Sequence, residues 1–168
     1  WDGSFVCESS ECPIEDGGTL LDFGSVSDNT MEIQFDSSSP VAGFQFEITG
    51  AQLYSASGGL AAQAGFTVSV GGSTVIGFSL TGGTVEGSGI LTNLSYEATD
   101  FQACIANVVL SDPSGNALDT IVGDCVVIIE PILGCTDSDA CNYDENANVD
   151  DGSCDYAEEN FDCDGNCT

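Results

Sequence analysis

The chain contains no lysine, arginine or histidine, and this absence limits its chemistry more than any other feature of the sequence. Its 168 residues include 28 Asp and Glu, so the formal net charge is −28 at pH 7. A globular chain of this length normally carries roughly 20 basic residues. Without them, the chain can form no salt bridge between side chains and no arginine clamp for phosphate. Any cation that neutralises the carboxylates must therefore come from outside the chain.

The composition excludes most enzyme classes and two classes of partner. Without histidine there is no side chain that ordinarily titrates near neutral pH, and no Ser-His or Cys-His pair for nucleophilic catalysis. Nucleic acids and anionic membrane surfaces repel a polyanion, and the longest apolar runs, such as Val126 to Ile129, are too short to cross a bilayer. The remaining catalytic option is a carboxylate pair of glycosidase type from Glu32, Glu47, Glu86 and Glu97. We expect no enzyme, no nucleic-acid partner and no membrane insertion.

The cysteines indicate an oxidising compartment. Because histidine and CxxC pairs are absent, disulfides are favoured over zinc, and disulfides persist outside cells. The number of cysteines, nine, is odd, which leaves three alternatives: a free thiol, two equivalent cysteines that meet across a two-fold axis, or a piece of a longer chain. The start at Trp1 fits a mature product or a fragment. The nine cysteines, all expected to form disulfides apart from this odd one, are Cys7, Cys12, Cys104, Cys125, Cys135, Cys141, Cys154, Cys163 and Cys167.

Alternating apolar and polar residues from about Leu20 to Ile129 predict an antiparallel sandwich or jelly roll. Gly71-Gly72 predicts a hairpin turn, only Leu60 to Ala64 suggests a helical turn, and Cys104 and Cys125 bracket about one strand and its return. The expected strands are Met31 to Asp36, Phe44 to Thr49, Phe66 to Val70, Thr74 to Leu80, Ile90 to Tyr96, Ile105 to Leu110 and Val126 to Ile129.

The composition changes after Pro131. Gly134 to Thr168 contains five cysteines and eleven Asp or Glu but almost no large aliphatic residues. Such a segment cannot fold on a hydrophobic core alone, and disulfides or a bound metal are the usual substitutes. We therefore expect an N-terminal Cys-containing linker at 1–18, a sandwich at 19–130 and a small disulfide-rich calcium-binding module at 131–168.

Calcium (Ca2+) is the expected ion because it takes six to eight oxygen ligands, which alternate positions of a short loop can supply. The pattern is not that of a standard EF-hand, since Val149 stands at the glycine position and Asp155 at the position of the final glutamate. The alternative is a solvated, disulfide-stapled surface that binds little or no calcium. The candidate ligands are Asp137, Asp139, Asp144, Asn146, Asn148, Asp150, Asp151, Asp155, Asp162 and Asp164.

Two segments resemble known families. GCTDSDACNYDENANVDDGSC, from Gly134 to Cys154, resembles the Cys/Asp-rich repeat of large secreted proteins of marine and aquatic bacteria, and is similar to thrombospondin type 3 calcium repeats. VAGFQFEITG and NVVLSDPSGNALDTIVGDC resemble cohesin-like domains, which are jelly-roll sandwiches of secreted bacterial proteins. The resemblance implies an all-β, cohesin-like jelly roll in an extracellular, bacterial protein. Cohesins bind dockerins, but no binding residue can be transferred to this chain.

Two functions remain. The first is a non-enzymatic structural subunit of an extracellular filament or surface fibre, stiffened by disulfides and calcium. DCDGNCT would run naturally into WDGSFVCESSEC, which suggests that the partner is another copy, in a head-to-tail homopolymer or a tandem array, with other matrix or surface components as further partners. The alternative is a recognition or adhesion module that binds a dockerin-like protein or a glycan.

Overall fold

The computed structural model describes residues 18–166, which form two compact units. The first unit ends at Ile128 and the second begins at Ile129, whereas the sequence placed the boundary between residues 130 and 131. Of the expected N-terminal linker, only Gly18 belongs to the described residues. No helix in residues 18–166 combines the length and the apolar character needed to cross a membrane.

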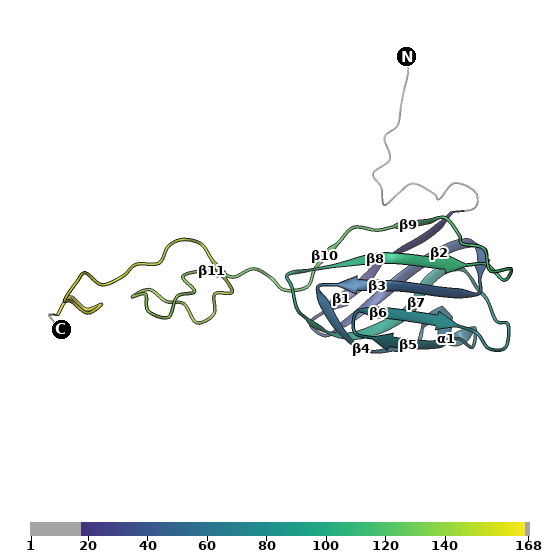
Figure 1. Ribbon diagram of the computed structural model, residues 1–168, viewed down its shortest axis with the longest axis horizontal. Helices are drawn as coiled ribbons and strands as arrows, with labels where there is room; N and C mark the ends of the chain where they lie inside the picture. The colour runs from purple at the N-terminus through teal and green to yellow at the C-terminus, as the bar shows by residue number, and fades with distance from the viewer. Residues whose placement is uncertain (1–17, 167–168) are drawn as a thin grey trace, which may run out of the picture. The chain divides into compact units, whose positions relative to one another are not determined.

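The first unit is a sandwich of two five-stranded sheets (Figure 1). The first sheet has the strand order β4-β7-β2-β1-β9. Its neighbouring strands pair antiparallel, except for β1 and β9, which are parallel. The bounds of its strands are β1 Thr19–Ser27, β2 Thr30–Val41, β4 Ala51–Ser57, β7 Val85–Ala98 and β9 Thr120–Val122.

The second sheet has the order β10-β8-β3-β6-β5, with antiparallel pairing throughout. The prediction of an all-β antiparallel sandwich is confirmed, and each of the seven expected strands overlaps a strand of the structure. The strands of the second sheet are β3 Gly43–Thr49, β5 Thr67–Gly71, β6 Thr74–Phe78, β8 Gln102–Ser111 and β10 Val126–Val127.

The hydrophobic core lies between the sheets. Met31, Ile33 and Phe35 of β2 are buried with Phe46 of β3, each at most 1% exposed. This follows from the period-two pattern, because every second side chain of a strand points to the same face. Complete burial of a side chain of this size contributes about 1.5–3 kcal/mol. The alternation that predicted these strands therefore also predicted their buried faces.

Phe44 extends the core and explains a glycine inside a strand. Its ring stacks on Phe46 and Phe66, with centroids 6.0 Å and 5.8 Å away. A Cβ added at Gly77 of β6 would lie 2.0 Å from Cζ of Phe44. Only glycine therefore leaves room for this ring, which is one reason why glycine occurs in strand interiors.

The structure contains the predicted hairpin, with a shifted turn, and the predicted helical turn. β5 and β6 form a hairpin in which Gly71 pairs with Thr74, so the turn is Gly72-Ser73, one residue later than expected. Gly72 has a φ of 65°, a conformation that favours glycine. The only helix among the described residues, α1, spans Gly59–Gln63, where a helical turn was expected.

The second unit has little regular structure. β11 (Leu133–Gly134) and β12 (Val149–Asp150) pair in parallel as a two-stranded sheet. In this unit, Cys135 and Ala140 are the only buried hydrophobic residues among those described. The prediction that this part of the chain lacks a hydrophobic core is therefore confirmed.

Candidate functional site

Five of the ten predicted calcium ligands stabilise the turns in which they lie. In each, Oδ1 accepts a hydrogen bond from the backbone N–H two residues further on, with N···O distances of 2.9 to 3.3 Å. This is the hydrogen bond of an Asx turn, in which the side chain takes the place of a backbone carbonyl. The five residues are Asp137, Asp144, Asp150, Asp151 and Asp162.

These hydrogen bonds favour the ionised carboxylate and so lower the pKa of three aspartates. The pKa of Asp137 lies below its ordinary value because of the Asp139 N–H first and the Tyr156 hydroxyl second. Hydrogen bonds from Ser153 lower the pKa of Asp151. The side-chain amide of Asn166 is the main cause for Asp162.

The side chain of Asn148 makes two hydrogen bonds to the backbone that precedes β11. Its Oδ1 accepts the backbone N–H of Ile132 at 2.8 Å, and its Nδ2 donates to the carbonyl of Glu130 at 3.1 Å. The side chain thus fixes the start of the second unit, Glu130 to Ile132, against β12. Replacing Asn148 by Asp would turn the Nδ2 donor into an acceptor that faces a carbonyl oxygen.

The other predicted ligands lie around these turns. The amide of Asn146 donates to Oδ1 of Asp144 at 3.1 Å. Asp155 interacts through its backbone, since its N–H donates to Oδ1 of Asn142 at 2.8 Å. Asp139 and Asp164 donate their backbone N–H groups to Asp137 and Asp162.

The ten residues do not form a common calcium site in the described structure. Among residues 18–166, no three Asp, Glu or Cys side chains lie close enough together to hold a metal ion. Calcium needs six or more oxygens around one point, and the arrangement of the described side chains does not fit that requirement. Calcium binding stays a prediction.

One of these turns has a counterpart in the sandwich. Asp112 and Asp162 each begin a loop with the pattern D-x-x-G-N, and each accepts the N–H groups two and four residues on, at 2.8 to 3.0 Å. In both loops the aspartate N–H donates to the asparagine carbonyl, at 2.9 Å and 2.8 Å. Asp112 is not among the ten candidate calcium ligands. The shared pattern therefore indicates a backbone-stabilising loop, a signal that sequence reasoning missed.

Three disulfides join the six cysteines that the structure describes. Cys104–Cys125 closes β8 against β10, as its position in the sequence suggested. The sequence left the pairing in the second unit open, and the structure shows Cys135–Cys154 and Cys141–Cys163, whose loops overlap. Cys7, Cys12 and Cys167 lie outside the described residues.

The outer face of the second sheet carries exposed apolar side chains. Ile76 and Phe78 of β6 and Val109 of β8 are 42%, 41% and 54% exposed. The register places Gln45 of β3 between Ile76 and Val109 and places Ser69 of β5 on the other side of Ile76. We call Ile76, Phe78 and Val109, with Gln45, Ser69 and Thr67, the apolar face. The sequence pattern does not reveal this face, because the T-V-I-G-F run of β6 is apolar on both sides of the strand.

Charge is distributed unequally between the two sheets. The strands of the second sheet contain one carboxylate, that of Glu47, which accepts a hydrogen bond from Nδ2 of Asn107 at 2.8 Å. The strands β8, β3, β6 and β5, which Figure 1 shows side by side, therefore form a surface with little charge. The strands of the first sheet contain Asp22, Glu32, Asp36, Glu86 and Glu97.

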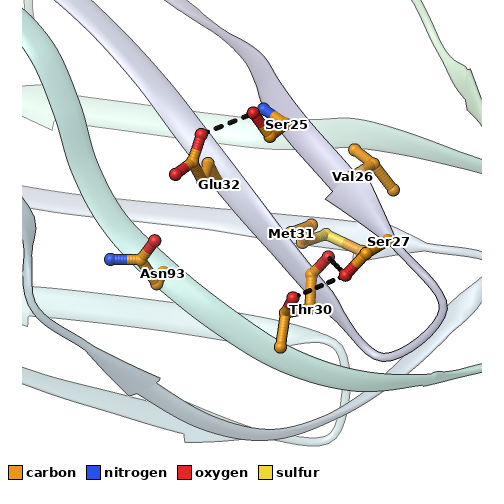
Figure 2. Close-up of a pocket in the computed structure, with 7 residues that line it drawn as sticks. All are labelled: Ser25, Val26, Ser27, Thr30, Met31, Glu32 and Asn93. Atoms are coloured by element: carbon orange, nitrogen blue, oxygen red, sulfur yellow. Dashed lines mark hydrogen bonds between the residues drawn. The ribbon is translucent and has the colours of Figure 1, made fainter.

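A small cleft of about 140 Å³ lies on the first sheet, where β1 bulges away from β2 (Figure 2). Oε2 of Glu32 accepts the N–H of Ser25 at 3.1 Å, and Asn93 pairs with Glu32 from the adjacent strand β7. Among residues 18–166, Glu32 is the only carboxylate that lines the cleft. The cleft therefore does not contain the two carboxyl groups that glycoside hydrolysis requires.

No protein-family model matches the chain, and neither does any curated protein. Among solved structures, a non-cellulosomal cohesin from the hyperthermophilic archaeon Archaeoglobus fulgidus matches with 17% identity and a TM-score of 0.48, covering 62% of this chain and 86% of the cohesin. A type I cohesin–dockerin complex from Clostridium thermocellum matches with 9% identity and a TM-score of 0.45. The match covers 67% of this chain and 94% of the matched chain.

A third match is the cohesin module of a family 33 glycoside hydrolase from Clostridium perfringens, with 14% identity and a TM-score of 0.41, covering 66% of this chain and 95% of the module. Cohesin modules are thus among the folds that this chain is similar to. At these values the likeness transfers no partner and no binding residue. The resemblance of the C-terminal segment to Cys/Asp-rich repeats stays a prediction.

Proposed function

We propose that this chain is a non-enzymatic structural protein that works outside the cell and assembles with further copies of itself through the apolar face. The observation that carries the proposal is that Ile76, Phe78 and Val109 are exposed on a sheet whose strands are almost free of charge. The three disulfides support an oxidising location. The lack of Lys, Arg and His supports a role without catalysis.

Electrostatics favours this face over the rest of the surface as the contact between copies. Each copy carries a formal charge of −28, so most approaches bring like charges together. Two apolar faces can meet with Glu47 as the only carboxylate from the strands of each sheet. Burial of the apolar side chains then opposes the long-range repulsion. Association should therefore strengthen with salt, which screens the repulsion without weakening hydrophobic contacts.

The contribution of Ile76 can be estimated. Complete burial of an isoleucine is worth about 1.5–3 kcal/mol. Since Ile76 is 42% exposed in the free chain, about 1 kcal/mol of that stabilisation is still to be gained in each copy. In a two-fold contact both copies gain it. Ile76→Ser should then raise the dissociation constant at least about tenfold.

Sedimentation velocity of the full chain, over a range of concentrations at low and high sodium chloride, tests the proposal. Ile121→Ser is the matched control, because Ile121 is 56% exposed but lies on β9 of the first sheet. We expect concentration-dependent association that salt strengthens, that Ile76→Ser weakens and that Ile121→Ser leaves unchanged. A chain that stays monomeric under all these conditions, or equal effects of both substitutions, would overturn self-assembly through this face.

The finer interpretations stay predictions within this proposal. In a filament or a tandem array, the second unit would connect successive copies, with its disulfides and any bound calcium limiting its motion. The alternative function, a recognition module for a dockerin-like protein or a glycan, would use one chain as a monomer. Monomeric sedimentation of the wild-type chain would favour that alternative.

A further inference from the structure

A pocket of about 350 Å³ opens on the second unit beside the Cys141–Cys163 disulfide. Tyr156 and Phe161 line it together with Asp155, Glu158 and Asp162. Pockets for small organic ligands begin at roughly this volume. The site lies entirely within residues 141–165, so it belongs to one unit.

Hydrogen bonds, rather than hydrophobic packing, position the two aromatic residues. The Tyr156 hydroxyl donates to Oδ2 of Asp137 at 2.7 Å, which fixes the far end of the ring. The Phe161 N–H donates to the carbonyl of Glu158 at 2.9 Å, across a turn in which Asn160 has a φ of 68°. Tyr156 is 54% exposed and Phe161 40% exposed. Both residues therefore retain apolar surface that a ligand in the pocket can cover.

The carboxylates of the pocket differ in what they already bind. Both carboxylate oxygens of Asp162 accept hydrogen bonds from the Asn166 amide. The side chains of Asp155 and Glu158 have no hydrogen-bond partner among the described residues. Two carboxylates thus remain available at a pocket with aromatic walls. A positive charge can interact with both kinds of group, because the face of an aromatic ring attracts cations.

We propose that this pocket binds the cationic side chain of a lysine or arginine from a different protein. The pocket offers aromatic surface for the aliphatic stem and the charged group of such a side chain, and the carboxylates of Asp155 and Glu158 for its N–H donors. No Lys, Arg or His side chain of these 168 residues, or of the same residues in another copy, can fill it, since they contain none. This role goes beyond self-assembly, because the pocket lies on the second unit rather than on the sandwich. Its partner is a protein with a cationic side chain rather than another copy of this chain.

Nuclear magnetic resonance can test the pocket with the full, isotope-labelled chain. The probe is N-acetyl-arginine methylamide, and its neutral isostere N-acetyl-citrulline methylamide controls for shape. We expect the arginine probe to shift the backbone signals of residues 155–165 in a saturable manner. The citrulline probe should leave these signals in place. Equal binding of the two probes would show that charge does not select the ligand and would overturn the proposal.

Substitutions that preserve charge separate the pocket from general attraction to a polyanion. Tyr156→Leu and Phe161→Leu leave the net charge unchanged, and each should weaken arginine binding by about two- to fivefold, the value of one exposed cation–π contact. Tyr156→Phe keeps the ring but loses its hydrogen bond to Asp137, so its affinity should lie between those of the wild type and Tyr156→Leu. Tyr143→Leu is the matched control, because Tyr143 is 47% exposed on the same unit but does not line the pocket. Unchanged binding in both leucine variants, or shifts spread over all acidic segments, would mean counterion attraction only and would refute the site.

Discussion

Removing the Cys135–Cys154 disulfide should unfold the second unit while the sandwich stays folded. The second unit buries only Cys135 and Ala140 among its described hydrophobic residues. Ordering one residue of backbone costs about 1–2 kcal/mol, and so little apolar burial offsets only a small part of that cost for this unit. The disulfides therefore provide a large share of its stability, because they restrict the unfolded chain.

The sequence separations give the size of this effect. Cys135 and Cys154 are 19 residues apart, and Cys141 and Cys163 are 22 apart. In the chain-entropy description, closing a loop of about 20 residues stabilises the folded state by about 3 kcal/mol. A net stability of that order is all that a coreless unit of this size can be expected to have. Loss of one disulfide is then enough to unfold it.

Hydrogen exchange followed by mass spectrometry measures the outcome in the double variant Cys135→Ser, Cys154→Ser. We expect the amides of Asp144 and Asn148, which donate to the carbonyls of Cys135 and Ile132, to lose their protection. Amides of the central strands β2 and β7 should exchange as in the wild type.

The double variant Cys104→Ser, Cys125→Ser is the control for the loss of a disulfide as such. It should lower the stability of the sandwich by about 3 kcal/mol and leave the protection of Asp144 unchanged. If Asp144 and Asn148 stay protected without Cys135–Cys154, the reasoning is refuted, and another force, such as bound calcium, holds the second unit.

Three further predictions concern the core and the acidic turns. Phe46→Ala should lower the free energy of unfolding of the sandwich by about 3–5 kcal/mol in urea denaturation followed by circular dichroism; a loss below about 1 kcal/mol would contradict complete packing. In hydrogen exchange, Asp162→Asn should keep the Asn166 N–H protected, whereas Asp162→Ala should not. If Asp162 is instead a calcium ligand, both variants should bind calcium more weakly in calorimetry. The pKa of Asp137 and Asp151 is lowered in the folded state, so their stabilisation is present above the ordinary value of 3.8 and is lost as pH falls through the folded pKa. Loss of amide protection that begins near neutral pH would contradict this assignment.

The sequence predicted the strands that show a regular alternation or a continuous apolar run, and missed those in which the pattern is broken or too short. β2 and β3 alternate large apolar with polar residues, and both were expected. β1 was missed because its register shifts between Phe23 and Val26, which breaks the alternation at Gly24. β4 was missed because only small residues follow Tyr54 and few of its side chains are buried. β9, with three residues, is too short to show a period.

The acidic residues show why a spacing alone does not define a metal site. An aspartate that points inward at every second position suits a calcium loop. The Asx turn depends on the same two-residue offset, because Oδ1 of residue i reaches the N–H of residue i+2. Asp144 and Asn146 fit both patterns, and the difference lies in whether distant side chains converge. Such convergence depends on how the loops pack, as does disulfide pairing, and neither can be read from one sequence.

The overlap of the two disulfide loops in the second unit protects the continuity of the chain against proteases. Cys141 lies inside the loop closed by Cys135–Cys154, and Cys154 lies inside the loop closed by Cys141–Cys163. A single cleavage anywhere between Cys135 and Cys163 therefore leaves both pieces covalently attached. Separation requires a cut in each of the three intervals between successive cysteines of these pairs. A nicked molecule could thus still transmit tension along its length.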